Sequence, residues 1–149
     1  MANDATTSKT DLPLLILRLV LGIAMVMHGV QKAQMGFAGT QAAFESMGVP
    51  GAAVAGPATM IIELVGGALI ILGAGTRIVG AIYTLVMLGA AAIVHLPAGF
   101  FVGDGGYEFV LVLAGIGAAL ALTGAGAWSV DRLIGSRRTS TASPERVDA

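Results

Sequence analysis

The stretch Leu12–Ala33, with the sequence LPLLILRLVLGIAMVMHGVQKA, decides the fold of this chain. A helix needs about 20 mostly apolar residues to cross the roughly 30 Å hydrocarbon core of a bilayer, and this stretch has that length. Only Arg18, His28 and Lys32 bring ionisable groups into it. We therefore predict a membrane-spanning helix here. Three further segments are comparably apolar and are predicted as the remaining spans: Ala55–Gly75, Ile78–Leu96 and Gly106–Leu122.

The composition favours a membrane protein over a soluble one. Of the 149 residues, 56% are hydrophobic and only 11% are charged, whereas a soluble domain carries roughly 25% charged residues. A soluble bundle needs polar outer faces, and Ile78–Leu96 has none, because only Tyr83, Thr84 and His95 interrupt it. We predict an all-α integral membrane four-helix bundle, surrounded by lipid, in which short loops make neighbouring helices antiparallel.

Several function classes are not expected from the composition. The net charge is −1 and no Lys/Arg cluster follows one face, so nucleic acid is not an expected partner. There is no cysteine, so the chain cannot itself carry out thiol–disulfide chemistry. Its two histidines and its carboxylates show no short ligand spacing, so no metal site is predicted. No intrinsic cofactor is expected.

The lysines and arginines predict the orientation in the membrane. Four spans put both termini and the second loop on one side, where the basic residues are Lys9, Arg77, Arg132, Arg137, Arg138 and Arg146. The other side has only Lys32. The positive-inside rule then places the termini in the cytoplasm, in a multi-pass plasma-membrane protein. The N-terminal residues 1–11 and the basic C-terminal tail, residues 129–149, are expected to be disordered. Between them lies a membrane domain of residues 12–128.

Most of the ionisable residues in the spans fall at one depth. His28, Lys32, Glu63, His95 and Glu108 all lie near the outer ends of their segments. Polar groups inside a bilayer are costly unless they are paired or functional, so these five form a candidate ligand-binding cluster.

Two features near this cluster are left open by the sequence. Arg18 lies deeper, about ten residues or roughly 15 Å along the helix from His28, so its membership of the cluster is undecided. The first loop, residues 34–56, contains an amphipathic stretch, Thr40–Met47. This stretch either lies on the outer interface, covers the bundle as a lid, or is a plain connection.

Each candidate also has a purely structural interpretation. Glu63 either handles substrate or protons, or serves as a charge partner that holds the bundle together. His95 and Glu108 are shallow enough for a solvated interface to explain them. Lys32 can extend its ammonium group to the interface.

The ordered motifs resemble the DoxX family of small four-helix bacterial membrane proteins. The first segment reads Arg18-Leu-Val-Leu-Gly22 and then His28-Gly-Val-Gln-Lys32, and the first loop ends Met47-Gly-Val-Pro50. The remaining matches are Glu63-Leu-Val-Gly-Gly67, Gly73-Ala-Gly-Thr-Arg77, His95 and Gly106-Tyr-Glu108. The resemblance extends over nearly all of residues 12–125.

This resemblance implies a link to redox chemistry. Related proteins are linked to quinone-coupled oxidation of sulfur compounds, and an actinobacterial relative is associated with a superoxide dismutase and a thiosulfate sulfurtransferase. The first hypothesis is therefore a redox-linked membrane subunit that binds a quinone or a small anion at the cluster. The second is a non-catalytic anchor or assembly partner for membrane-associated redox, oxidative-stress or sulfur-handling enzymes. A solute or proton pathway is weaker, because the inner half offers only Arg18, Thr84 and Thr123 as polar residues.

The first two hypotheses differ in what they require of the structure. Ligand binding requires a cavity under the first loop, and Glu63→Gln should then lose activity without losing the fold. An anchor requires a closed, paired cluster, and the same substitution should then destabilise the protein. Whether the chain is an enzyme stays open at this point.

Overall fold

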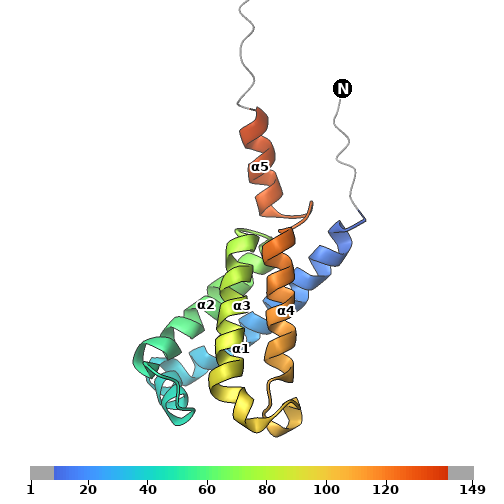
Figure 1. The fold of residues 1–149 in the computed structure, drawn as a ribbon. Coiled ribbons are helices and arrows are strands. Elements are labelled where there is room, and N and C mark those ends of the chain that lie inside the picture. The colour runs from blue at the N-terminus through green and yellow to red at the C-terminus, as the bar shows by residue number, and fades with distance from the viewer. Residues whose placement is uncertain (1–8, 141–149) are drawn as a thin grey trace, which may run out of the picture.

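Helices dominate because the apolar segments are rich in good helix formers such as Leu, Ala and Met. Within a bilayer, a helix also satisfies its backbone hydrogen bonds internally. The computed structural model describes residues 9–140, and this part of the chain is all-α (Figure 1). Its five α-helices are α1 (Asp11–Ser46), α2 (Ala52–Leu72), α3 (Thr76–Ala90), α4 (Glu108–Thr123) and α5 (Val130–Ser140).

The first four helices form two antiparallel pairs. α1 packs along α2, and α3 packs along α4, with fewer contacts between the pairs (Figure 1). The start of α1, the α2–α3 turn and α5 lie at one end, here called the terminus end. The last part of α1 and the α3–α4 connection lie at the other, here called the loop end. A π-helical turn, Ala91–His95, and two 3₁₀ turns, Leu96–Ala98 and Val102–Asp104, build that connection.

Glycines set the distance within each pair. A Cβ atom on Gly22 of α1 would lie 2.8 Å from the carbonyl oxygen of Gly67 in α2, and a Cβ on Gly67 equally close to Gly22 O. In the second pair, a Cβ on Gly80 would lie 2.8 Å from Gly117 O. Small residues that let helix backbones approach are typical of membrane helix interfaces.

The outer surface of the bundle is apolar. Val54, Ile78, Leu85 and Leu122 are 70–78% exposed and come from three different helices. α1, α2 and the run Thr76–Ala98 are long and apolar enough to cross a membrane, while α4 is apolar but has only 16 residues. These surfaces fit a lipid environment.

The helix boundaries differ from the predicted spans in two places. α1 does not end near Ala33 but continues through a kink to Ser46, and it includes the predicted amphipathic stretch up to its last residue, Met47, which is the C-cap. Part of the tail expected to be disordered, residues 130–140, forms α5. The Oγ of Ser129 accepts a hydrogen bond from Arg132 N (3.2 Å), as in a helix N-cap. The other expected tail residues, 1–8 and 141–149, lie outside the described part.

Arg18 joins three segments at the terminus end. Its side chain is buried and donates four hydrogen bonds of 2.7–3.0 Å, to the carbonyl oxygens of Ile70, Ile71, Ala125 and Trp128. The first two acceptors belong to the last turn of α2, where a positive charge is favoured by the helix dipole. Arg18 is therefore a structural link at the terminus end, remote from the loop-end residues.

Asp131 makes the complementary contact at the start of α3. Its carboxylate accepts hydrogen bonds from Gly75 N (2.7 Å) and Thr76 N (3.0 Å), where a negative charge suits the helix dipole. Partial burial alone would raise the pKa of Asp131, but these backbone donors and the positive charge of Arg18 outweigh it and hold the pKa below its ordinary value of 3.8.

Gly80→Ala should destabilise the α3–α4 pair. The added methyl would meet backbone atoms, Gly117 O at 2.8 Å and Ala121 N at 3.0 Å, which cannot move aside as a side chain can. We expect a loss of about 1–3 kcal/mol, seen as a lower melting temperature in detergent. Gly115→Ala is the matched control, because a Cβ there meets no atom within 4 Å. Equal melting temperatures for the two variants would contradict this packing.

Asp131→Asn should weaken the terminus end by about 1 kcal/mol, the usual value of a lost helix cap. Because the folded pKa is lowered, the stabilisation from the Asp131 charge is present above the ordinary pKa and is lost as the pH falls through the folded value. The melting temperatures of wild type and variant should therefore differ at neutral pH and converge in acid. A difference that does not change with pH would contradict this role.

Candidate functional site

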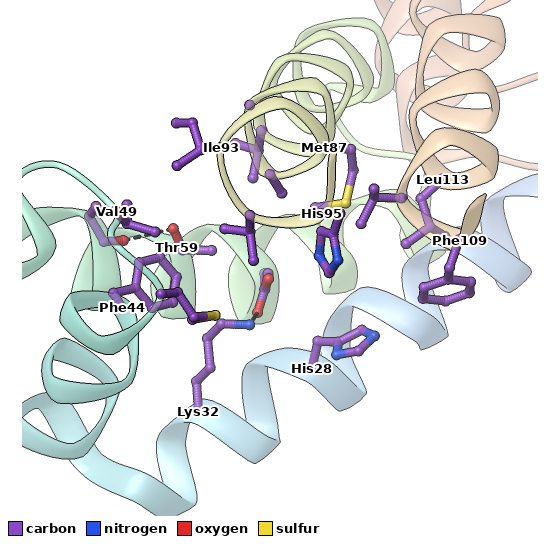
Figure 2. A pocket seen from close by; sticks show the side chains of 18 of the residues that line it. His28, Lys32, Phe44, Val49, Thr59, Met87, Ile93, His95, Phe109 and Leu113 are labelled. Atoms are coloured by element: carbon purple, nitrogen blue, oxygen red, sulfur yellow. Dashed lines mark hydrogen bonds and ion pairs between the residues drawn. The ribbon is translucent and has the colours of Figure 1, made fainter. Parts of the chain in front are cut away.

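A cavity of about 500 Å³ lies at the loop end between the two helix pairs. Its walls are mostly apolar, and Figure 2 shows side chains from all four helices around it. Phe44, Met47 and Val49, from the end of α1 and the following loop, also line it. The first loop thus lies over part of the cavity instead of being a plain connection.

An ion pair stands in the cavity wall. The ammonium Nζ of Lys32 in α1 lies 2.6 Å from Oε2 of Glu63 in α2, and the two side chains are only 15% and 4% exposed. Figure 2 shows the side chain of Lys32 pointing from its helix toward the cavity. Two opposite charges so close satisfy each other's need for a partner in apolar surroundings.

Tyr83 of α3 holds the helical turn that carries Glu63. Its side chain is fully buried, and its hydroxyl donates to the carbonyl oxygens of Ile62 (3.0 Å) and Glu63 (3.1 Å). A Cβ atom on Gly66 would lie 2.7 Å from this hydroxyl, so the contact needs a glycine there. The sequence marked Tyr83 only as an interruption of an apolar segment and gave no sign of this role.

A kink at Gly36 directs the end of α1 over the cavity. Gly36 has φ 71° and ψ 175°, a conformation essentially restricted to glycine. The hydroxyl of the buried Thr40 donates to Gly36 O (2.9 Å) and Lys32 O (3.0 Å), which satisfies carbonyl groups at the kink. A Cβ on Gly56 would lie 3.1 Å from Thr40 O, so α2 starts close against this turn. The kink brings Phe44 to the cavity.

Two imidazoles complete the polar part of the lining. His28, one turn before Lys32, is half-buried, and its ring centroid lies 6.0 Å from that of Phe109 in α4. His95, at the end of the π-helical turn, has Nδ1 2.7 Å from Gly105 O. Because a carbonyl only accepts, Nδ1 of His95 carries a proton, and Nε2 is the acceptor in the neutral ring.

The family of this chain follows from its sequence. The DoxX family profile matches residues 13–96, more than half of the chain. The chain belongs to the DoxX family. The match includes four of the cavity's polar residues, His28, Lys32, Glu63 and His95, while the α4 wall lies beyond it.

Relatives of this DoxX protein are described as membrane or redox proteins. "Putative oxidoreductase CatD" of Bacillus subtilis (strain 168) is 38% identical over 120 residues, 80% of this chain and 85% of the relative. "Inner membrane protein YqjF" of Escherichia coli (strain K12) is 33% identical over 129 residues, 85% of this chain and 95% of that protein. "Inner membrane protein YphA" of the same strain is 34% identical over 124 residues, 80% of this chain and 88% of that protein. No solved structure matches.

The structure brings together only part of the predicted cluster. Glu108 lies outside the cavity lining, because its Oε2 accepts a hydrogen bond from Val102 N (3.0 Å) and closes the turn before α4. Arg18 lies at the terminus end. Within residues 9–140, no three His, Cys, Asp or Glu side chains are placed to hold a metal ion.

Glu63→Gln should destabilise the DoxX protein by roughly 2–4 kcal/mol, because it leaves the Lys32 charge without its partner in a low-dielectric site. Lys32→Met should have a similar effect, and the double variant should lose less than the sum of the two. The measurement is thermal unfolding in detergent. Glu45→Gln is the matched control, since Glu45 is exposed and outside the cavity lining. Additive losses would show that Lys32 and Glu63 do not interact.

Proposed function

We propose that this DoxX protein is a redox-linked membrane subunit whose loop-end cavity binds a quinone head group. The observation that carries the proposal is an apolar cavity of about 500 Å³ with an ion pair and two imidazoles in its lining. Ligand sites of 300–1,000 Å³ with apolar walls and a few placed polar groups are typical for small molecules. The name of the Bacillus relative supports a redox role.

The polar groups suit an aromatic ring that carries two carbonyl oxygens. The Lys32 ammonium has three N–H donors, and one of them is used by Glu63. A further donor is available for a ligand carbonyl. The apolar side chains of Met87, Phe109 and Leu113 offer surfaces for a flat ring.

A bound quinone would supply two-electron, two-proton chemistry. The imidazoles of His28 and His95 offer nitrogen atoms that can donate or accept hydrogen bonds, and Glu63 provides a carboxylate for proton exchange. The chain has no cysteine and no recognisable haem or flavin motif, so we propose that electrons reach the site from a partner enzyme.

The proposed topology has four spans with cytoplasmic termini. With its 16 residues, α4 is about 24 Å long at 1.5 Å per residue. It lies antiparallel to α3 along its length. Arg77 and Arg132 lie at the terminus end, and the positive-inside rule favours that end for the cytoplasm. In this orientation the cavity lies in the outer half of the bilayer.

An anchor function is the second candidate. The ion pair between Lys32 and Glu63 is already closed without a ligand, as a purely structural cluster would be. Because this pair is closed, a loss of stability in Glu63→Gln is expected under either function and does not separate them. The experiment below does separate them, because only the first function requires the cavity to be free.

The test is thermal unfolding of the purified protein with and without a menaquinone analogue. We expect wild type to be stabilised by the analogue, because a ligand that binds only the folded state raises its stability. Gly89→Leu should lose this shift. Gly89 lines the cavity, and a Cβ there meets no atom within 4 Å, so a larger side chain added at this position takes up cavity space.

Gly115→Leu is the matched control for helix propensity, since Gly115 also has open space around a Cβ but does not line the cavity. This variant should keep the shift. If the analogue stabilises none of the proteins, or stabilises Gly89→Leu as much as wild type, the quinone-site proposal fails and the anchor function becomes the better one.

A further inference from the structure

A second, more polar cleft of about 660 Å³ lies at the terminus end. It is bounded by the first turn of α3, the segment from Thr123 to Ala127 and the first turn of α5. Four charged residues line it: Asp11, Arg77, Asp131 and Arg132. No step of the proposed function uses this cleft.

The two carboxylates in this cleft are engaged by backbone groups. Asp131 accepts the hydrogen bonds from Gly75 N and Thr76 N, and Asp11 accepts one from Ala127 N at 2.7 Å. The positive charge of Arg18 also helps to lower the pKa of Asp131. The acidic groups are therefore tied to the fold instead of being available for a cation.

The two guanidinium groups, by contrast, have donors to spare. An arginine carries five N–H donors, and Arg77 gives one long hydrogen bond to Thr123 O (3.3 Å). The exposed side chain of Arg132 makes no hydrogen bond to the described residues. Two guanidinium groups at one cleft form a suitable binding site for a phosphate group, which arginine recognises with paired hydrogen bonds.

Apolar surface begins directly beside Arg77. Ile78, next to Arg77, is 70% exposed, and Leu122, next to Thr123, is 78% exposed. Both side chains lie on the apolar outer surface of the α3–α4 pair. A soluble anion would use the arginines but would gain nothing from these two side chains.

We propose that this cleft binds an anionic phospholipid, with its phosphate between Arg77 and Arg132 and its acyl chains against Ile78 and Leu122. The site is independent of the ligand of the loop-end cavity. It would fix the terminus end of the bundle at the lipid headgroups.

The test is native mass spectrometry of the full chain in detergent, titrated with dioleoyl phosphatidylglycerol or dioleoyl phosphatidylcholine. We expect phosphatidylglycerol to bind at least about tenfold more tightly, and Arg77→Gln/Arg132→Gln to lose about tenfold or more of that affinity, since charge-assisted hydrogen bonds are involved. Arg132→Gln alone should fold as wild type, because Arg132 is exposed, and should show a smaller loss. Arg77→Lys/Arg132→Lys should keep part of the preference.

Lys9→Gln is the matched control, because Lys9 is an exposed basic residue near the start of α1 that does not line the cleft. It should leave the affinity for phosphatidylglycerol within about twofold of wild type. Equal binding of the two lipids, or an equal loss with Lys9→Gln, would overturn the proposal. Inorganic phosphate that competes with phosphatidylglycerol at equal affinity would instead assign the cleft to a soluble anion and overturn the lipid assignment.

Discussion

The ion pair between Lys32 and Glu63 is the interaction on which the rest of the loop end depends. Two charges among apolar helices are tolerated only if they meet closely, and here their atoms lie 2.6 Å apart. The fold supports this meeting from both sides. Tyr83 holds the turn that carries Glu63, and Thr40 holds the kink that follows Lys32. The cavity lies directly beside the pair.

The two ends of the bundle use their charges differently. At the terminus end, Arg18 donates to carbonyl groups at the end of α2 and after α4, and Asp131 accepts from N–H groups at the start of α3. These bonds hold the two helix pairs together. At the loop end, Lys32 and Glu63 pair with each other and border an open space. The first arrangement suits a rigid base, and the second suits a site where a ligand can change the partners of a charge.

The sequence predicted the helical class and the proximity of four polar residues, but not the contacts that support them. Apolar length identified the four segments, and the depth of polar residues brought His28, Lys32, Glu63 and His95 to one cavity. Thr40 and Tyr83 were missed, because their hydroxyl groups donate hydrogen bonds to backbone carbonyls of other turns. The periodicity of the sequence does not reveal such contacts. Glu108 was placed in the cluster by depth alone, whereas its local bond to Val102 N directs it to a turn.

Infrared difference spectroscopy on Glu63 tests the central claim most directly. The spectrum of the wild-type protein with the menaquinone analogue minus that without it would be compared with the same difference for Glu63→Gln. Our account predicts an ionised carboxylate band that is absent in Glu63→Gln and that shifts when the analogue binds, because the ligand changes the surroundings of the ion pair. A protonated carboxyl band at Glu63, or a carboxylate band unaffected by the analogue, would contradict a ligand site at the Lys32–Glu63 pair.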